Sequence, residues 1–208
     1  MKSATADTAA PIAATTRLLG ELLTSRRLPL GLLFAALLIA VRPVYHLTLR
    51  VVSQWQAERL WRDRPQNSQL VFSGDPIAWL SHRESGLDTL VLLDGNQENL
   101  NRFPCWSMAG SMPDRRGLKI ILGHRDAHFR ELGLMSQGET VQLKTQQGGQ
   151  TFVVDQIEIV EKEQLGDHLI MSQDRDAVVL VTCYPFTYTG SAPHRYLVWL
   201  RPQKEPLV

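Results

Sequence analysis

A cysteine at the end of an apolar run is the first residue of this chain that could do chemistry. Cys183 follows the run Val178–Val181, which is apolar and mostly β-branched, and Thr182. Such a run is typical of a buried strand, and Pro185 prevents further strand pairing soon after it. A thiol held at the exit of a rigid strand can act as a nucleophile once it is deprotonated. The alternative is a small core residue, which is the usual role of a cysteine in apolar surroundings.

A histidine occupies the same position relative to another apolar run. His124 follows Leu118–Leu122 after one glycine, Gly123, which permits the close approach of another chain segment. An imidazole at a strand end could act as general acid and base for a nearby thiol, or it could be a loop histidine bonded to the backbone. Asp126 could orient this imidazole, or it could cap the short helical turn predicted over residues 128–132.

An arginine opens the last apolar run of the chain. The loop 184–193 is rich in Gly, Pro and hydroxyl residues, and Arg195 stands just after it. If this loop joins two adjacent antiparallel strands, Arg195 lies close to Cys183. A guanidinium there could stabilise a developing oxyanion, or it could be a solvated charge at a strand edge. His194 is a rival base and Cys105 a rival thiol, although no predicted strand leads into Cys105.

These residues need a scaffold, and the pattern beyond residue 65 predicts one that is mainly β. Short apolar runs are separated by turn residues, which indicates a barrel or a sandwich. Residues 139–144 and 149–160 form a predicted hairpin, and the alternation in its first strand predicts one solvated face. The predicted strands are Leu70–Phe72, Ile77–Leu80, Thr89–Leu93, Leu118–Leu122, Thr140–Leu143, Thr151–Val160, Ala177–Thr182 and Tyr196–Leu200.

The composition excludes several classes of function. The 208 residues are 44% hydrophobic and 21% charged, with a formal net charge of +1. A chain of this kind can bury a core, but it lacks the basic surface of a nucleic-acid-binding protein. Its two cysteines are too few for a disulfide framework, and its six histidines lack the spacing of zinc ligands. The sequence therefore predicts no metal site and no cofactor.

The N-terminal part differs from the rest of the chain. Residues 1–25 are predicted to be a disordered cytoplasmic tail, and residues 26–64 a membrane anchor with a juxtamembrane helix that continues to about residue 61. The run Leu28–Val41 is uncharged and follows two arginines, as expected for an anchor with its N-terminus inside. It is shorter than the about 20 residues of a full span, so a cleaved signal peptide and a buried core helix are alternatives. Residues 65–208 form the predicted working domain.

The three candidate residues lie within motifs that resemble those of the sortases, the membrane-anchored cysteine transpeptidases of bacteria. Val179–Cys183 is similar to the family's strand ending Thr-Leu-x-Thr-Cys, with valine in place of the first threonine. Gly123–Phe129 is similar to the Gly-His-Arg-Asp-Thr-His-Phe signature of a proteobacterial subgroup. The Thr-Cys-Tyr-Pro-Phe sequence at 182–186 and the Gly-Ser-Ala-Pro loop before Arg195 also match that subgroup. The resemblance covers roughly residues 70–200 and departs from the subgroup at Pro113-Asp114 and at Pro104-Cys105-Trp106, two segments that border the expected groove.

The resemblance implies a fold and an activity. The fold is a closed sortase-type β-barrel of about eight strands with short helices, preceded by the anchor helix. The activity is cleavage of a C-terminal sorting signal of Leu-Pro-x-Thr-Gly type through a thioester on Cys183, and transfer of the acyl group to an amine. His124 would move the protons, Arg195 would stabilise the oxyanion, and Thr182 and Asp126 would support the site.

The implied partners are a secreted protein substrate, an amine acceptor and the inner membrane, with the catalytic domain facing the periplasm. The resemblance does not specify the exact sorting motif, the acceptor or calcium binding. A thiol peptidase without transfer and a catalytically silent envelope scaffold remain alternative functions. Because the periplasm is oxidising and Cys105 belongs to a segment that borders the groove, a regulatory disulfide between Cys105 and Cys183 is a further hypothesis; a lone buried thiol is the alternative.

Overall fold

The computed structural model describes residues 27–63 and 71–203 of the chain. The chain divides into two compact units between Val51 and Val52. The predicted tail at residues 1–25 and the predicted domain boundary at residues 64–65 lie outside the described residues.

Helix α2, Arg27–Asp63, confirms the prediction that a helix continues to about residue 61. In its first half, the described large apolar side chains between Leu30 and Val41 are all more than half exposed. Among the helices in residues 27–63 and 71–203, none is both long enough and apolar enough to cross a membrane.

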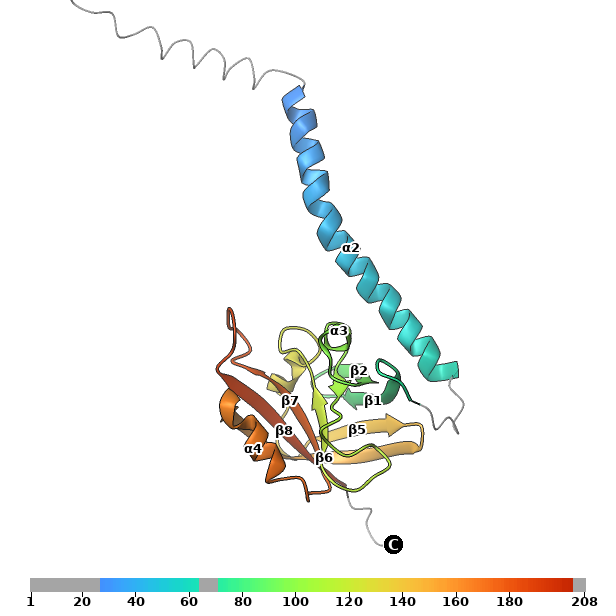
Figure 1. Ribbon diagram of the computed structural model, residues 1–208, viewed down its shortest axis with the longest axis vertical. Helices are drawn as coiled ribbons and strands as arrows, with labels where there is room; N and C mark the ends of the chain where they lie inside the picture. Colours follow the sequence, from blue (N-terminus) through green and yellow to red (C-terminus); the bar gives the residue numbers. More distant parts are fainter. Residues whose placement is uncertain (1–26, 64–70, 204–208) are drawn as a thin grey trace, which may run out of the picture. The chain divides into compact units, whose positions relative to one another are not determined.

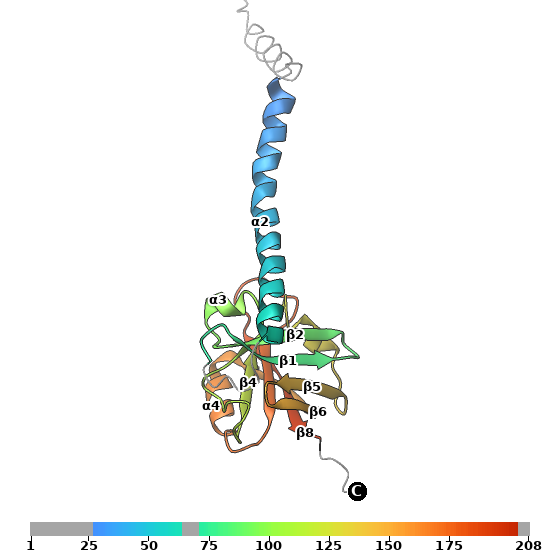
Figure 2. The same cartoon turned by 90° about the vertical axis from the view of Figure 1, so that its right-hand side faces the viewer.

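The second unit contains a closed β-barrel, as predicted, with short helices between its strands (Figures 1 and 2). The strand order around the barrel is β1-β2-β3-β4-β7-β8-β6-β5. Two neighbouring pairs are parallel, β2 with β3 and β4 with β7, and the others are antiparallel. In chain order the elements are β1 Pro76–His82, β2 Leu87–Leu93, α3 Gln97–Leu100, β3 Cys105–Trp106, β4 Lys119–Leu122, η1 Arg130–Leu134, β5 Thr140–Thr145, β6 Gly148–Glu161, η2 Lys162–Gln164, α4 Leu165–Ile170, β7 Val178–Tyr184 and β8 His194–Pro202.

Most predicted strands are present, and two differences have a physical reason. The predicted hairpin is formed by β5 and β6, and β5 has the alternating burial of a strand with one solvated face. No strand includes Val71 and Phe72, and the Phe72 side chain is exposed, so apolar residue types alone gave a wrong prediction there. Strand β3 was missed because two residues are too few to show a period.

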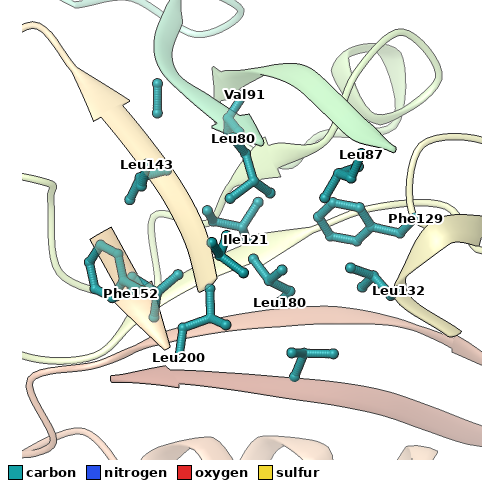
Figure 3. Packing of buried hydrophobic residues seen from close by; sticks show 14 of the residues in the cluster. Leu80, Leu87, Val91, Ile121, Phe129, Leu132, Leu143, Phe152, Leu180 and Leu200 are labelled. Carbon is teal, nitrogen blue, oxygen red and sulfur yellow. The ribbon is translucent and has the colours of Figure 1, made fainter. Parts of the chain in front are cut away.

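The continuous apolar sequence of β7 is explained by burial on both of its faces. Val178 and Leu180 belong to the barrel's interior cluster, in which Leu80, Ile121, Leu180 and Leu200 meet between the strands (Figure 3). Val179 and Val181 belong to a second cluster, against which Leu165 and Leu169 of α4 pack. Strand β7 is thus enclosed from both sides, and a residue at its end is held on a rigid support.

Strands β4 and β7 are anchored at their beginnings by an ion pair between a buried lysine and an exposed aspartate. Lys119 Nζ lies 3.0 Å from Asp176 Oδ1 and donates to the Gly117 carbonyl at 3.2 Å. The Lys119 amide also donates to the Ala177 carbonyl. These contacts set the parallel register in which Lys119 is aligned with Val178 and Leu122 with Val181. The same register determines which residues lie near each other where the two strands end, beyond Leu122 and Val181.

Candidate active site

Cys183 lies near the end of β7 with a free, partly exposed thiol. Side chains alternate between the two faces of a strand, so Cys183 shares the outer face with Val179 and Val181. The buried residues before it in β7 restrict its backbone, while Cys183 itself is only half-buried. This combination suits a nucleophile better than a core residue.

Arg195 is directly opposite Cys183 on the neighbouring strand β8, as the loop-and-strand pattern predicted. Directly opposed residues of an antiparallel pair point to the same face, with their Cβ atoms about 5 Å apart. Arg195 Nη1 donates to the carbonyls of Ala192 and His194, at 3.1 and 2.8 Å. The remaining guanidinium nitrogens make no hydrogen bond with any residue in the described part of the chain, so donors beside the thiol are left unused.

His124 is brought to the same end of the barrel by the parallel pairing of β4 with β7. The pairing continues one residue beyond β4, because the Gly123 amide donates to the Val181 carbonyl at 3.1 Å. The hydroxyl of Thr182, which is buried, donates to the Gly123 carbonyl at 2.7 Å. Gly123 is therefore held beside Thr182, and His124 follows it at the same end of β7 as Cys183.

The glycine before the histidine is required by the ring of Phe129. A Cβ atom at Gly123 would lie 2.5 Å from Phe129 Cδ2, far inside van der Waals contact. Phe129 is completely buried, and its amide donates to the His124 carbonyl at 3.0 Å. The chain therefore turns back on itself after His124, with the ring packed where a side chain at Gly123 would be.

Two further residues of this turn were missed as candidates. Arg125 Nη2 donates to the carbonyls of Tyr188 and Gly190, at 2.6 and 3.3 Å, and thereby joins the turn to the β7–β8 loop. His128 stacks on Phe103, with the ring centroids 6.2 Å apart. The only sequence signal for either residue was its membership of the motif around His124, since these contacts join segments that are distant in the chain.

Asp126 neither hydrogen-bonds to the His124 imidazole nor caps the helical turn that follows it, the two roles considered from the sequence. It is exposed, and within the described part of the chain it makes no hydrogen bond or ion pair, either with His124 or with another residue. The helical turn after it, η1, begins beyond Phe129, which takes the N-cap position without any side-chain cap. The prediction that Asp126 caps this turn is therefore wrong.

The rival base His194 is on the other face of its strand. It is paired with Tyr184, one position away from the Cys183–Arg195 pair, so alternation directs its side chain away from the thiol. His194 is partly buried at the beginning of β8. Of the two histidines, His124 is therefore the candidate base at this end of β7.

The rival thiol Cys105 is a core residue. It is completely buried in a cluster with Ala57, Leu90, Leu92 and Phe103. Burial, and to a smaller degree the charge of Asp94, raises the pKa of the Cys105 thiol to about 12. The thiolate is the reactive form of cysteine, so Cys105 is unreactive at neutral pH. Its sulfur is directed to the Phe103 carbonyl at 3.4 Å.

The hypothesis of a disulfide between Cys105 and Cys183 is wrong for this fold. Cys105 pairs with Leu122 on β4, and Leu122 pairs with Val181 on β7. Two strand spacings of about 4.8 Å each therefore separate Cys105 from β7, and Cys183 is two residues further along that strand. A disulfide requires Cα atoms within about 7 Å.

The arrangement combines a thiol, an imidazole and a guanidinium at one end of a closed barrel. These groups supply a nucleophile, a proton carrier and a stabiliser of negative charge, which are the requirements of acyl transfer through a thioester. Among the described residues, no group of three or more His, Cys, Asp or Glu side chains is arranged to hold a metal ion.

Known proteins share both the sequence pattern and the fold. Sortase D of Bacillus subtilis (strain 168) is 33% identical over 87 residues, which are 42% of this chain and 43% of that protein, so the match spans less than half the length of this curated relative. A sortase D5 transpeptidase of Clostridium perfringens has the same fold, with a TM-score of 0.62 and 18% identity over 76% of this chain and 99% of the other. Sortase C1 of Streptococcus agalactiae is similar as well, with a TM-score of 0.56 and 19% identity over 81% of this chain and 91% of the other.

The family model described as Sortase domain matches residues 83–203. This range begins in the first hairpin of the barrel and ends just after β8, so it contains Cys183, His124 and Arg195 together with most of the strands that position them. The chain belongs to the sortase family.

Proposed function

We propose that this protein is a cysteine transpeptidase that cleaves a C-terminal sorting signal of Leu-Pro-x-Thr-Gly type and joins the acyl fragment to an amine. The observation that carries the proposal is the cross-strand pair of Cys183 and Arg195, beside which the Thr182–Gly123 hydrogen bond holds the His124 turn. The similar Clostridium perfringens protein is itself described as a transpeptidase, which supports the same chemistry.

The first half of the reaction forms a thioester. The Cys183 thiol gives its proton to His124, its sulfur attacks the carbonyl carbon of a peptide bond, and the electron pair of the C=O bond moves to its oxygen. Arg195 faces this oxyanion with guanidinium N–H groups that the β7–β8 loop does not use. The carbonyl re-forms as the C–N bond breaks, and His124 donates a proton to the departing amine.

The second half releases the acyl group. An amine attacks the thioester carbon, a new C–N bond forms, and the C–S bond breaks to return the sulfur to Cys183. His124 accepts the proton that the attacking amine loses. Water in place of the amine would give hydrolysis, so the alternative of a thiol peptidase differs only in this step.

We also propose the cellular setting that the motifs imply. The sequences around His124 and Cys183 resemble those of the proteobacterial subgroup, and we assign the protein to that subgroup. The barrel then faces the periplasm, where secreted substrates arrive. An anchor at residues 26–64 would attach the protein to the inner membrane. The uncharged run Leu28–Val41 and the exposed apolar side chains of α2 support this, since a large exposed apolar surface requires a covering partner.

Trapping of the thioester tests the proposal. A labelled peptide that contains a Leu-Pro-x-Thr-Gly sequence is incubated with the wild type and with Cys183→Ala, and intact mass is recorded. A covalent acyl adduct on the wild type alone is expected, and addition of triglycine should convert it to a ligated peptide. Adduct formation that yields only hydrolysed peptide would favour the thiol peptidase. If a panel of such peptides leaves both proteins unmodified, the catalytic proposal fails and the silent scaffold is favoured.

A further inference from the structure

Arg125, the residue after His124, connects the two loops that border the site. Its Nη2 group donates to the Tyr188 carbonyl at 2.6 Å and to the Gly190 carbonyl at 3.3 Å. The guanidinium carbon also lies 5.7 Å from the centre of the Tyr188 ring, within the range of a cation–π contact. One side chain therefore holds the β7–β8 loop by two backbone carbonyls and one aromatic ring.

The loop that Arg125 holds is the covalent link between Cys183 and Arg195. It leaves β7 after Tyr184 and enters β8 at His194. Residues 187–191 are exposed, so the packing against them is slight. At its far end the loop is held by Arg195, which donates to the Ala192 carbonyl. Arg125 and Arg195 thus hold the same loop from opposite sides of the site.

Arg125 is half-buried, and its Nη1 atom is enclosed with no hydrogen-bond partner among the described residues. Buried donors in folded proteins are nearly always paired, and an unpaired one calls for an explanation. An arginine selected only to strengthen the fold would be expected to use this donor as well. Because Arg125 directly follows His124, it can also fix the position of the turn that carries the imidazole.

We propose that Arg125 is a positioning residue for the acyl-transfer site. Through the Tyr188 and Gly190 carbonyls it fixes the β7–β8 loop relative to the His124 turn, and so keeps the imidazole, the thiol and the Arg195 guanidinium in one geometry. The inference rests on the proposed function for its catalytic consequence. The clamp itself is a property of the folded protein and can be measured without a substrate.

The test compares full-length wild type with Arg125→Ala, Arg125→Lys and Arg130→Ala. Arg130 is a matched control because it is exposed and its side chain makes no hydrogen bond or ion pair within the described part of the chain. Limited proteolysis by chymotrypsin at Tyr188 measures the clamp directly, because cleavage requires the loop to leave its held position. Peptide cleavage kinetics measure its effect on the reaction, since misplacement of reacting groups by about 1 Å can lower rates about 100-fold.

Arg125→Ala should raise the rate of chymotrypsin cleavage at Tyr188 about tenfold or more and lower kcat by about 10- to 100-fold, with KM changed less than kcat. Arg125→Lys should fall between Arg125→Ala and the wild type, because a single ammonium lacks the planar fork of a guanidinium. Arg130→Ala should match the wild type in both measurements.

A rate of chymotrypsin cleavage at Tyr188 in Arg125→Ala equal to that of the wild type would overturn the inference, whatever the kinetics. A raised chymotrypsin rate with unchanged kcat would overturn it too, because the clamp would then have no part in positioning the site. If the wild type does not cleave the sorting peptide but chymotrypsin cuts the variant faster, the clamp is supported and the proposed function is the part that fails.

Discussion

At the scale of single residues, the two cysteines show how position decides reactivity. Cys105 is enclosed by apolar side chains, and its pKa is raised to about 12 by burial. Cys183 is partly exposed and faces a guanidinium on the next strand. The same functional group is therefore unreactive at Cys105 and suited to nucleophilic attack at Cys183.

Alkylation should separate the two thiols. With iodoacetamide at pH 8, native protein is expected to be modified at Cys183 only, because Cys105 is buried and remains protonated. Peptide mass mapping after a time course gives the ratio. Raising the pH to 10 should still spare Cys105, since its folded pKa lies about two pH units higher, whereas unfolding in denaturant should expose both thiols. Modification of Cys105 at a rate similar to that of Cys183 in native protein would contradict this account.

The hydroxyl of Thr182 is expected to matter for both stability and activity. Thr182→Val keeps the shape of the side chain but removes the donor to the Gly123 carbonyl. The loss should destabilise the fold by about 1–3 kcal/mol and lower kcat by freeing the His124 turn. Urea unfolding and peptide cleavage measure the two effects. Thr182→Ser, which retains the hydroxyl, is the control, and the account is wrong if the Val variant is the more active of the two.

At the scale of elements, the site depends on one parallel pair and one antiparallel pair. The β4–β7 pair brings the His124 turn to the end of β7, and the β7–β8 pair puts Arg195 opposite Cys183. On the other face of β7 and β8, the rings of Tyr184 and Tyr196 pack together with Phe186 of the loop that follows β7. Strands β7 and β8 thus each carry a candidate site residue on one face and an aromatic residue on the other.

The packing of the His124 turn predicts that Gly123→Ala is severe. The new methyl group would meet the buried Phe129 ring at 2.5 Å, and overpacking of this kind costs about 1–3 kcal/mol. Displacement of the ring or of the backbone should also lower kcat, which would appear in steady-state cleavage assays of folded variant protein.

Gly166→Ala provides the matched control for the added methyl group. Gly166 is in helix α4, and nothing lies within 4 Å of the position that a Cβ atom would take there. Alanine is favoured over glycine in helices by about 1 kcal/mol, so this variant should be as stable as the wild type or more so. Equal unfolding midpoints for the two variants would show that the Phe129 contact is not a constraint.

At the scale of the whole molecule, the chain joins a long helix to a barrel that contains the whole candidate site. The first unit presents a continuous series of large apolar side chains to solvent along α2. The barrel buries most of its own within three clusters and exposes only scattered ones, such as Phe72 and Met171. The two units therefore differ in the solvent exposure of their apolar side chains. This difference is the physical basis for the proposed membrane anchor.

Charged substitutions in α2 test that anchor. Replacing Leu33 and Leu37, both exposed, by lysine should cost about 2.5–3.5 kcal/mol per residue for insertion at the helix centre. Full-length wild type is expected in the carbonate-washed membrane pellet, and the double lysine variant in the supernatant. The double valine variant should stay with the pellet. Recovery of the wild type in the supernatant would exclude the anchor.

Most of the barrel could be predicted because its strands carry their own local signal. The apolar run of β7 and the alternation of β5 report burial on two faces and on one face, respectively. The site residues were found where such runs end. Two strand predictions failed because the local sequence was the only guide. Val71 and Phe72 are apolar but belong to no strand. The two residues of β3 show no pattern of their own and are defined only by their pairing with β2 and β4.

The sequence by itself determined the types of reactive group, their places at strand ends and the family that the motifs resemble. Tertiary structure alone decided which groups meet. Strand pairing put Arg195 opposite Cys183 and the His124 turn at the same end of β7. Alternation turned His194 away, and the intervening strand β4 kept Cys105 apart from Cys183. The loop contacts of Arg125 were likewise beyond prediction. Pairing and register arise from contacts between segments far apart in the chain, and no local pattern encodes them.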